Sequence, residues 1–544
     1  MVPGSSLANI EIPDLLHEQA HSGVDHQALL EVLGLAFLGR ELGTQIHDAL
    51  ARATVPDSQW QPGLFASDIF LRRLIESSFT LQIGGRRYPV NHDFLFRSLA
   101  HAPTDLATIA MRQGVLRELD ADEILRERTY ALYREIFDLL SLMKTPGYHG
   151  AIELAAFHLD IFRQAKLVID FMDESFAGAA SALRRLHDSA SAWRESEEYR
   201  TLVDLLELES SLARLGLQVT VGGDGRLREL TVHRVEEPSR NRFYRRPLRR
   251  LLDRWRLLYR GYPMSNRELM DRLVNDVFRQ VSPALVPLVQ VLGHLEVYLT
   301  ARSFRDRATS LGLETSLASF DEGAPLRLER LFNPLLLDQA RPPVPCTIES
   351  RGTAPITLVT GPNSGGKTRL LQSIALAQLL GQSGLYAPCG AARLRVENGL
   401  FVSLVEEEGA SQTEGRLGRE LVRIRSLFEE MSRGSMVILD ELCSGTNPSE
   451  GTEVFAMVLR LLRRVEPRAF ATTHFLDFAR TLRDQGAIHG LEFLQVEVDA
   501  RLESTYQFEP GVAETSLAAL TAERLGVTFE RLAAKLEDRE AGPG

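Results

Sequence analysis

The pattern of apolar and polar positions changes near residue 325. Before this point apolar residues recur every three or four positions, whereas from about 325 to 512 short apolar runs alternate with longer amphipathic stretches. The first pattern is typical of packed helices, and the second predicts buried parallel strands joined by helices. We therefore expect a mostly helical region followed by an α/β domain.

Long helices and one hairpin are predicted in the first region. The helical pattern covers 94–143, which contains the start signal APTD, about 197–215, and about 266–308, where Pro283 and Pro287 predict a bend or break. Residues 217–235 alternate apolar and polar positions around the turn GGDG, which predicts a β-hairpin. Long helices around a hairpin-tipped insertion form a lever arm, and a plain helical bundle with a surface hairpin fits the same pattern.

Composition narrows the class of protein. The chain has 544 residues, 44% of them hydrophobic and 25% charged, which is typical of globular proteins with several domains. The formal charge of −11 repels nucleic acid at long range, so a polyanionic partner requires a local basic surface. Nearly every cation is arginine, and the bias extends along the whole chain. A single arginine is therefore weak evidence for a binding site.

Cysteines and terminal segments indicate the compartment. Cys346, Cys389 and Cys443 are far apart, which argues against a disulfide framework or a structural zinc site. The N-terminus lacks the basic flank and apolar core of a secretory signal. The most apolar stretch, 282–299, contains Gln, His and Glu and is too polar to span a bilayer. We expect a cytoplasmic protein without a membrane partner.

A nucleotide site is predicted by GPNSGGKT, which fits the P-loop pattern G-x-x-x-x-G-K-[ST]. Glycines let the backbone wrap around phosphate oxygens and point N–H groups at them from the start of a helix. In this pattern Lys367 neutralises phosphate oxygens and Thr368 binds Mg²⁺. We predict a site for ATP and Mg²⁺ made by Gly361, Pro362, Asn363, Ser364, Gly365, Gly366, Lys367 and Thr368.

Two further apolar runs end in polar residues. SMVIL precedes Asp440 and Glu441, and AFATT leads to His474. A carboxylate at a strand end beside a P-loop can hold Mg²⁺, its neighbour can orient the attacking water, and a third polar group can contact the γ-phosphate. The carboxyl ends of parallel strands meet at one edge of a sheet. We therefore predict that Asp440 binds the metal and that Glu441, His474 and Lys367 are catalytic.

Four segments together resemble the MutS family of mismatch-repair ATPases. These are TGPNSGGKT (360–368), GQSGLYAPC (381–389), LDELCSGTNPSEG (439–451) and ATTHF (471–475). Residues 97–119 are similar to the start of the family's helical core, and 511–538 to the helical segment through which its members dimerise. The resemblance implies an α/β P-loop ATPase of the ABC type, with a mixed or parallel sheet, joined to a largely helical lever and clamp.

The same resemblance implies a domain order and a partner. The expected order is an N-terminal helical region (1–90), a helical core or lever (91–320) with a clamp-like insertion at about 197–262, the ATPase domain (325–512) and a dimerisation segment (513–544). A homodimer acting as an ATP-gated clamp on mismatched or branched DNA is the implied assembly. A nuclease or ribosome partner is left unspecified by the sequence.

Details of the resemblance favour one branch of the family. The forms NPSEG and QSGLYAPC are most similar to the short, anti-recombination branch, which does not itself repair mismatches. We expect neither that branch's C-terminal Smr nuclease domain nor the family's mismatch-reading domain, whose Phe-x-Glu wedge is absent from the first hundred residues. Mismatch recognition by that route is therefore not expected.

One segment departs from the family pattern. MutS proteins present a serine-containing loop to the ATP of the opposite subunit, but here Leu417 and Gly418 stand near the expected serine and threonine. Ser411 and Thr413 lie earlier and can substitute for them, and Gly415 and Arg416 can offer an N–H and a cation to the γ-phosphate. Dependence on a partner's serine is thus in question, and a scaffold with weak hydrolysis is an alternative.

The densest basic run follows the predicted hairpin. Residues 240–262 hold nine arginines, one acid and five aromatics, a combination that can neutralise phosphates and stack on bases. An arginine-rich helix covering a leucine core fits the same residues. We predict nucleic-acid contacts from Arg242, Arg245, Arg246, Arg249 and Arg250. DNA is the favoured target, and a ribosome or structured RNA is the alternative.

Overall fold

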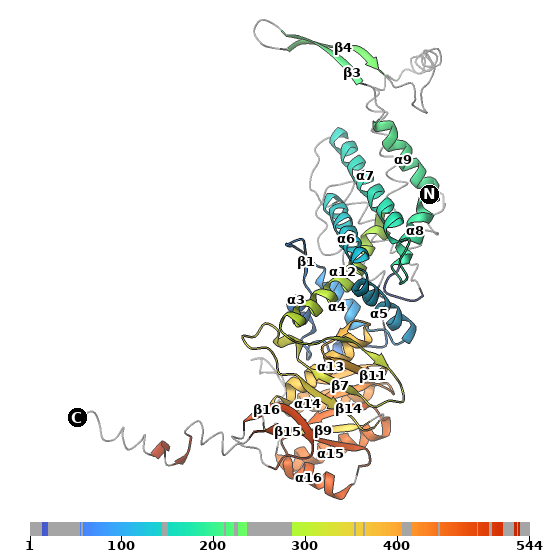
Figure 1. Cartoon of the computed structure of the whole chain (residues 1–544). Helices are drawn as coiled ribbons and strands as arrows, with labels where there is room; N and C mark the ends of the chain where they lie inside the picture. Colours follow the sequence, from blue (N-terminus) through green and yellow to red (C-terminus); the bar gives the residue numbers. More distant parts are fainter. Residues whose placement is uncertain are drawn as a thin grey trace, which may run out of the picture. The chain divides into compact units, whose positions relative to one another are not determined.

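The computed structural model describes most of the chain and divides it into two compact units (Figure 1). Unit 1 comprises Met1–Leu15, Ala20–Thr54 and Glu118–Leu295, and unit 2 comprises Leu16–Gln19, Val55–Arg117 and Glu296–Gly544. The described residues are 13–19, 55, 58–143, 151–210, 214–221, 227–236, 285–352, 355–362, 365–404, 416–443, 447–486, 488–499, 503–514, 527–529 and 531–533.

A six-stranded sheet forms the centre of unit 2. Its order is β12 (Leu400–Ser403), β13 (Met436–Leu439), β14 (Arg468–Thr472), β9 (Ile356–Thr360), β15 (Leu491–Val498) and β16 (Ser504–Pro510). The first five strands are parallel, and β16 pairs with β15 in the antiparallel sense. Strands β9, β13 and β14 are buried at every position, as expected for parallel strands covered on both faces. The predicted α/β class is confirmed.

Helix α13 (Lys367–Gln382) follows β9 through the glycine-rich loop. It contacts β13 and β14 of the six-stranded sheet, and also β7 and β11 of a smaller sheet. Because it lies between two sheets, it is buried all round rather than along one stripe. The smaller sheet has the order β6 (Ser319–Phe320), β11 (Ala391–Leu394), β7 (Arg327–Leu331) and β8 (Cys346–Glu349), and β10 (Tyr386–Ala387) pairs with β5 (Ser316–Leu317).

Three amphipathic helices pack against the six-stranded sheet and form a hydrophobic core with it. They are α14 (Arg416–Glu430), α15 (Pro448–Val465) and α16 (Leu476–Gln485), and they bury Leu427, Leu459 and Leu482 in one cluster with the strands. Helix α15 starts at a sequence signal, because the Asn447 side chain accepts the Ser449 N–H at 3.1 Å and proline occupies the first helical turn.

The N-terminal part of unit 2 is a string of short elements. These are η2 (Pro62–Leu64), α3 (Leu71–Ser78), the hairpin β1 (Leu81–Ile83) and β2 (Arg86–Tyr88), α4 (His92–Ala100) and α5 (Leu106–Ala121), and η4 (Pro334–Leu336) occurs later in the chain. Asp105 accepts the Thr108 N–H at 2.7 Å, so the predicted start signal APTD is confirmed. The helical pattern over 94–143 is divided among α4, α5 and α6, because caps interrupt it.

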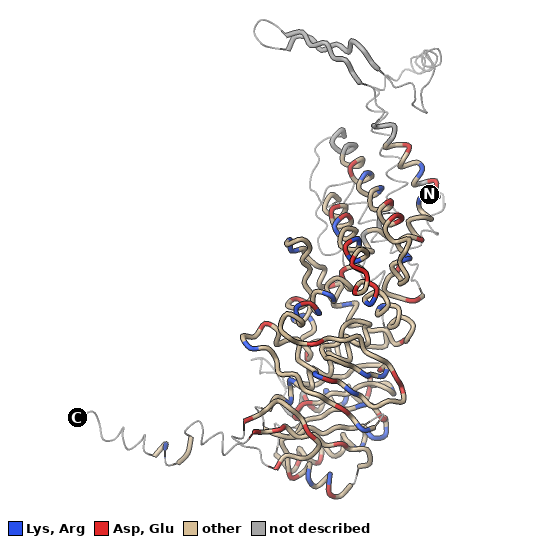
Figure 2. Tube along the Cα trace, viewed as in Figure 1, with Lys and Arg blue, Asp and Glu red and all other residues tan. Residues whose placement is uncertain are grey.

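Unit 1 is built from antiparallel helices. They are α6 (Glu123–Met143), α7 (Ala151–Phe176), α8 (Arg184–Glu195) and α9 (Glu197–Ser210). Both acidic and basic residues lie along them (Figure 2), and some form pairs, such as Lys166 Nζ with Asp170 Oδ2 at 2.5 Å. Asp170 Oδ1 also accepts the Tyr199 hydroxyl at 2.5 Å, which fastens α9 to α7.

The predicted hairpin is confirmed. Strands β3 (Arg214–Val221) and β4 (Leu227–Glu236) are antiparallel, and Leu217 lies opposite Val232. One predicted helix limit is wrong: α9 ends at Ser210, and residues 214 and 215 of the predicted 197–215 helix belong to β3. Helix α12 (Leu285–Ser310) covers the C-terminal part of the predicted 266–308 helix. Residues 266–284 of that prediction lie outside the described residues.

Candidate nucleotide site

The glycine-rich loop is shaped by close packing against β15. Gly361 has a φ of 137°, and a Cβ built there would lie 2.7 Å from Val496 Cγ2. A Cβ on Gly365 would lie 2.8 Å from the same methyl group, and Gly366 has a φ of 82°. Glycine is therefore required at 361 and 366 by conformation, and at 361 and 365 by space.

The Lys367 side chain is folded back onto the loop. Its Nζ donates to the carbonyl oxygens of Gly361 at 2.9 Å and Pro362 at 3.1 Å, and only 2% of the side chain is exposed. Burial lowers the pKa of Lys367, whereas Glu441, whose carboxylate lies 3.7 Å away, and Asp440 oppose that change. The ammonium group thus lies beside the glycine-rich loop, where phosphate oxygens can replace the two carbonyl oxygens as its hydrogen-bond acceptors.

Thr368 and Asp440 form an oxygen-rich pair beside this lysine. Thr368 Oγ1 donates to Asp440 Oδ2 at 2.6 Å, and Thr472 Oγ1 donates to Asp440 Oδ1 at 2.5 Å. Hydroxyl and carboxylate oxygens are the ligands that Mg²⁺ prefers. Thr472 was not predicted from the sequence, although its position at the end of β14 was the available signal.

Glu441 lies in a strained turn directly after β13. Its φ is 44° and that of Cys443 is 60°, both in the left-handed region. The Glu441 N–H donates to Thr472 Oγ1 at 2.8 Å, and the Cys443 N–H donates to Glu420 Oε2 at 2.8 Å. These bonds hold a conformation that non-glycine residues rarely adopt, as is common at functional sites.

His474 follows the end of β14, the strand between β13 and β9. Its ring centroid is 4.2 Å from that of Phe475, and its buried Nδ1 has no hydrogen-bond partner among the described residues. In that part of the chain no hydrogen bond joins it to Lys367 or Asp440. The predicted role of His474 therefore stays a prediction.

An aromatic residue that the sequence did not single out lies beside the loop. Tyr506 on β16 has a φ of 59°, is 48% exposed, and has Cδ1 3.2 Å from the position that a Gly366 Cβ would occupy. The neighbouring Ser504 hydroxyl reaches the Gly365 carbonyl at 3.5 Å. An exposed ring next to a phosphate loop can stack on a nucleobase.

Several predicted site residues cannot be placed. Asn363, Ser364 and Gly415 lie outside the described residues, as do Arg242, Arg245, Arg246, Arg249 and Arg250. Arg416 is the first residue of α14, and its side chain is likewise outside the description. The trans-subunit and nucleic-acid sites therefore stay predictions.

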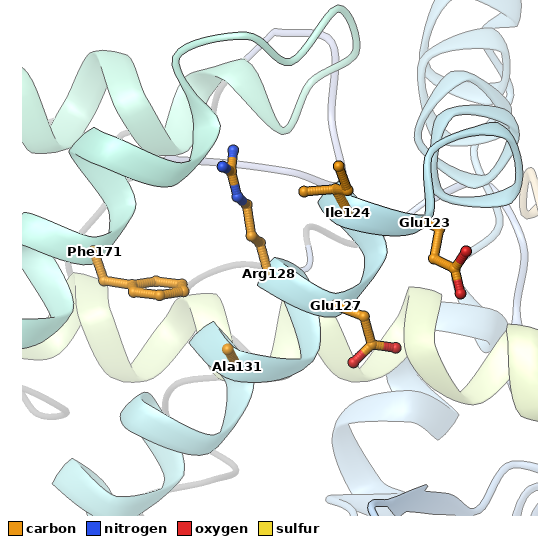
Figure 3. A pocket seen from close by; sticks show the side chains of 6 residues that line it. All are labelled: Glu123, Ile124, Glu127, Arg128, Ala131 and Phe171. Atoms are coloured by element: carbon orange, nitrogen blue, oxygen red, sulfur yellow. The ribbon is translucent and has the colours of Figure 1, made fainter.

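A separate hollow in unit 1 contains none of the predicted site residues. It has a volume of about 580 Å³ and opens between α6 and α7, as Figure 3 shows. Its lining consists of Glu123, Ile124, Glu127, Arg128, Ala131 and Phe171.

Among the helices that the structure describes, none is long and apolar enough to cross a membrane.

Comparison with known proteins places this site in a family. Residues 357–533 match the family model for MutS domain V. Endonuclease MutS2 of Streptococcus agalactiae serotype Ia is 31% identical over 244 residues, which are 44% of this chain and 29% of that protein. Endonuclease MutS2 of Thermus thermophilus is 30% identical over 271 residues, 49% of this chain and 35% of that protein. The match thus covers about a third of each relative. Residues 357–533 thus match MutS domain V, and the chain is similar to MutS2 proteins over somewhat less than half of its length.

Proposed function

We propose that the chain binds ATP with Mg²⁺ and hydrolyses it, using an ABC-type P-loop fold. The observation that supports this best is the convergence of one lysine, two hydroxyls and two carboxylates at the carboxyl ends of the neighbouring strands β9, β14 and β13. Ligands of open parallel sheets bind at this edge, and the P-loop helix starts there.

Each side chain has a role that its present contacts make possible. Lys367 exchanges two carbonyl partners for phosphate oxygens, and the N–H groups at the start of α13 face the same oxygens. Thr368 and Asp440 hold Mg²⁺, which neutralises charge on the phosphate chain. The Tyr506 ring stacks on the nucleobase, because it is the exposed aromatic group beside Gly366.

Glu441 is the residue we assign to the attacking water. Its carboxylate lies 3.7 Å from the Lys367 ammonium and its side chain is 20% exposed, so it reaches both the phosphate position and solvent. His474, two residues beyond β14, supplies a ring nitrogen to the γ-phosphate. These roles follow the division of work in phosphoryl transfer, where positioning and charge do most of the catalysis.

We further propose that hydrolysis gates a dimeric clamp on mismatched or branched DNA. Unit 1 supplies long helices and a hairpin, the arginine-rich run 240–262 follows that hairpin, and the relatives carry the name endonuclease MutS2. ATP binding can change the affinity for DNA only if the two states of the dimer bind nucleotide differently. Control of DNA repair or recombination is the corresponding cellular role.

Two substitutions test the ATPase proposal. Lys367→Ala is expected to abolish ATP binding, because the buried ammonium is lost, whereas Glu441→Ala is expected to retain binding and stop turnover. The measurements are filter binding of labelled ATP and steady-state phosphate release. Equal turnover in Glu441→Ala and the natural protein would refute the assignment of Glu441.

A further inference from the structure

A buried carboxylate outside the nucleotide site joins two elements that border it. Asp68 lies between η2 and α3, and its side chain is completely buried. Its Oδ1 accepts the N–H of Leu404 at 2.9 Å, and its Oδ2 accepts the Arg423 guanidinium. Leu404 directly follows β12, and Arg423 belongs to α14. Asp68 therefore ties a strand end and a helix that are distant from it in sequence.

The surrounding segment covers an edge of the six-stranded sheet. Within the described residues β12 is the outer strand on one side. Trp60 Nε1 donates to the carbonyl of Glu397 just before β12 at 3.0 Å, η2 packs against β12, and Asp68 binds just after it. Edge strands present unpaired backbone groups that neighbouring segments can satisfy. Residues 60–68 thus contact β12 through η2 and bind the chain just before and just after this strand.

Both elements tied by Asp68 support the turn that carries the catalytic carboxylates. The carbonyl of Ser403, at the end of β12, accepts the Asp440 N–H at 2.8 Å. Glu420, on α14 one turn before Arg423, accepts the Cys443 N–H at 2.8 Å. Arg423 Nη2 also donates to the Val402 carbonyl at 2.7 Å, so α14 and β12 are joined directly as well.

The turn at residues 440–443 has a backbone conformation that requires hydrogen bonds from neighbouring elements. Glu441 and Cys443 have φ values of 44° and 60°, and residues held in this region persist only when their surroundings over-determine them. We propose that Asp68, acting with Arg423, is a positioning residue for hydrolysis that keeps residues 440–443 aligned. No hydrogen bond or ion pair joins either side chain to the described part of the nucleotide loop, 361–362 and 365–366, and the inference rests on the proposed ATPase function.

The test compares kcat with nucleotide affinity. Asp68→Ala and Arg423→Ala are each expected to lower kcat about 10- to 100-fold while the Kd for ATP stays within about 3-fold of the natural value, because misplacement of Glu441 affects the reaction more than phosphate binding. Arg423→Lys keeps one cationic donor and is expected to recover part of kcat. Because Arg423 is about a third exposed, its variants stay testable if Asp68→Ala does not fold.

Two control variants separate positioning from general damage. Ser67→Ala removes only the hydroxyl that donates to Asp68 Oδ2 at 3.1 Å and is expected to leave kcat unchanged. Glu397→Gln alters another buried carboxylate of unit 2, paired with Arg395 at 2.7 Å, and is expected to lower the melting temperature without changing kcat.

The outcomes distinguish this inference from the proposed function. If the natural protein releases no more phosphate than Lys367→Ala, the proposed ATPase function fails and the inference falls with it. If the natural protein is active and Arg423→Ala keeps its full kcat, only the inference is overturned. The inference is also overturned if kcat in Arg423→Ala falls no more than in Glu397→Gln.

Discussion

Thr472 is the residue at which the account of the metal site makes its sharpest prediction. Its hydroxyl donates to Asp440 Oδ1 at 2.5 Å and accepts the Glu441 N–H at 2.8 Å, and the side chain has no exposed surface. Thr472→Val keeps the shape and removes both bonds. The variant leaves the part-buried Glu441 N–H unpaired and frees one oxygen of Asp440, the carboxylate proposed to bind Mg²⁺.

The magnitude follows from these two bonds. A hydrogen bond to a charged group contributes about 1.5–3 kcal/mol, and an unpaired donor that is shielded from water costs about 1–3 kcal/mol, so the unfolding free energy should fall by about 2.5–6 kcal/mol. Loss of an orienting partner typically costs about 10- to 100-fold in metal affinity. The Mg²⁺ concentration for half-maximal ATPase activity should therefore rise by about that factor.

Thr357→Val is the matched control. Thr357 is a buried strand threonine on β9 whose hydroxyl has no hydrogen-bond partner among the described residues, so its loss should be neutral or stabilising. The assay is a Mg²⁺ titration of phosphate release together with a thermal melt. If Thr472→Val and Thr357→Val give the same Mg²⁺ dependence and the same melting temperature, the reasoning about Asp440 is wrong.

The remaining predictions concern the loop and its neighbours. Tyr506→Ala should weaken ATP binding about 5- to 100-fold without affecting binding of inorganic triphosphate, because stacking is worth about 1–3 kcal/mol per base; equal losses for both ligands in equilibrium binding would contradict a stacking role. Gly365→Ala should lower the melting temperature, and adding Val496→Ala should restore it because space is freed for the new Cβ. The same second substitution should not restore the melting temperature of Gly361→Ala, since a φ of 137° remains unfavourable for alanine. Equal recovery of both variants would refute this difference between the two glycines. Lys367→Met should raise the melting temperature of the nucleotide-free protein, because burial lowers the lysine pKa. That cost is fully present below the lowered pKa and is relieved as pH rises from it toward 10.5, so a gain that did not shrink with rising pH would contradict it.

The sequence predicted those parts of the site whose spacing is fixed by chemistry. Lys367 and Thr368 share one short motif, and Asp440 ends an apolar run that proved to be a buried strand. The apolar runs before Asp440 and before His474 form the neighbouring strands β13 and β14, and β14 also pairs with β9. Parallel strands that are buried on both faces tolerate few polar residues, so an apolar run of this kind predicts such a strand.

Other residues depend on contacts that no local pattern encodes. Tyr506 meets Gly366 only because the antiparallel β15–β16 pair returns the chain to the loop, and Asp68 meets Arg423 across more than 300 positions. Thr472 lies inside the apolar run AFATT (469–473), and the sequence predicted a role only for His474, which follows this run. Predicted helix ends were wrong where a cap or the start of a strand ended the helix although the apolar pattern continued, as at Ser210.

The central claim is that ATP bound at Lys367 controls the affinity of a dimer for DNA. Its most direct measurement is the affinity of Glu441→Ala for a four-way junction, with ATP and without nucleotide, at fixed salt and with homoduplex DNA and ribosomes as competitors. The account predicts a dimer whose junction affinity changes at least about 5-fold with ATP, the size of an ordinary coupling between two sites. A monomer with the same affinity in both conditions would contradict it.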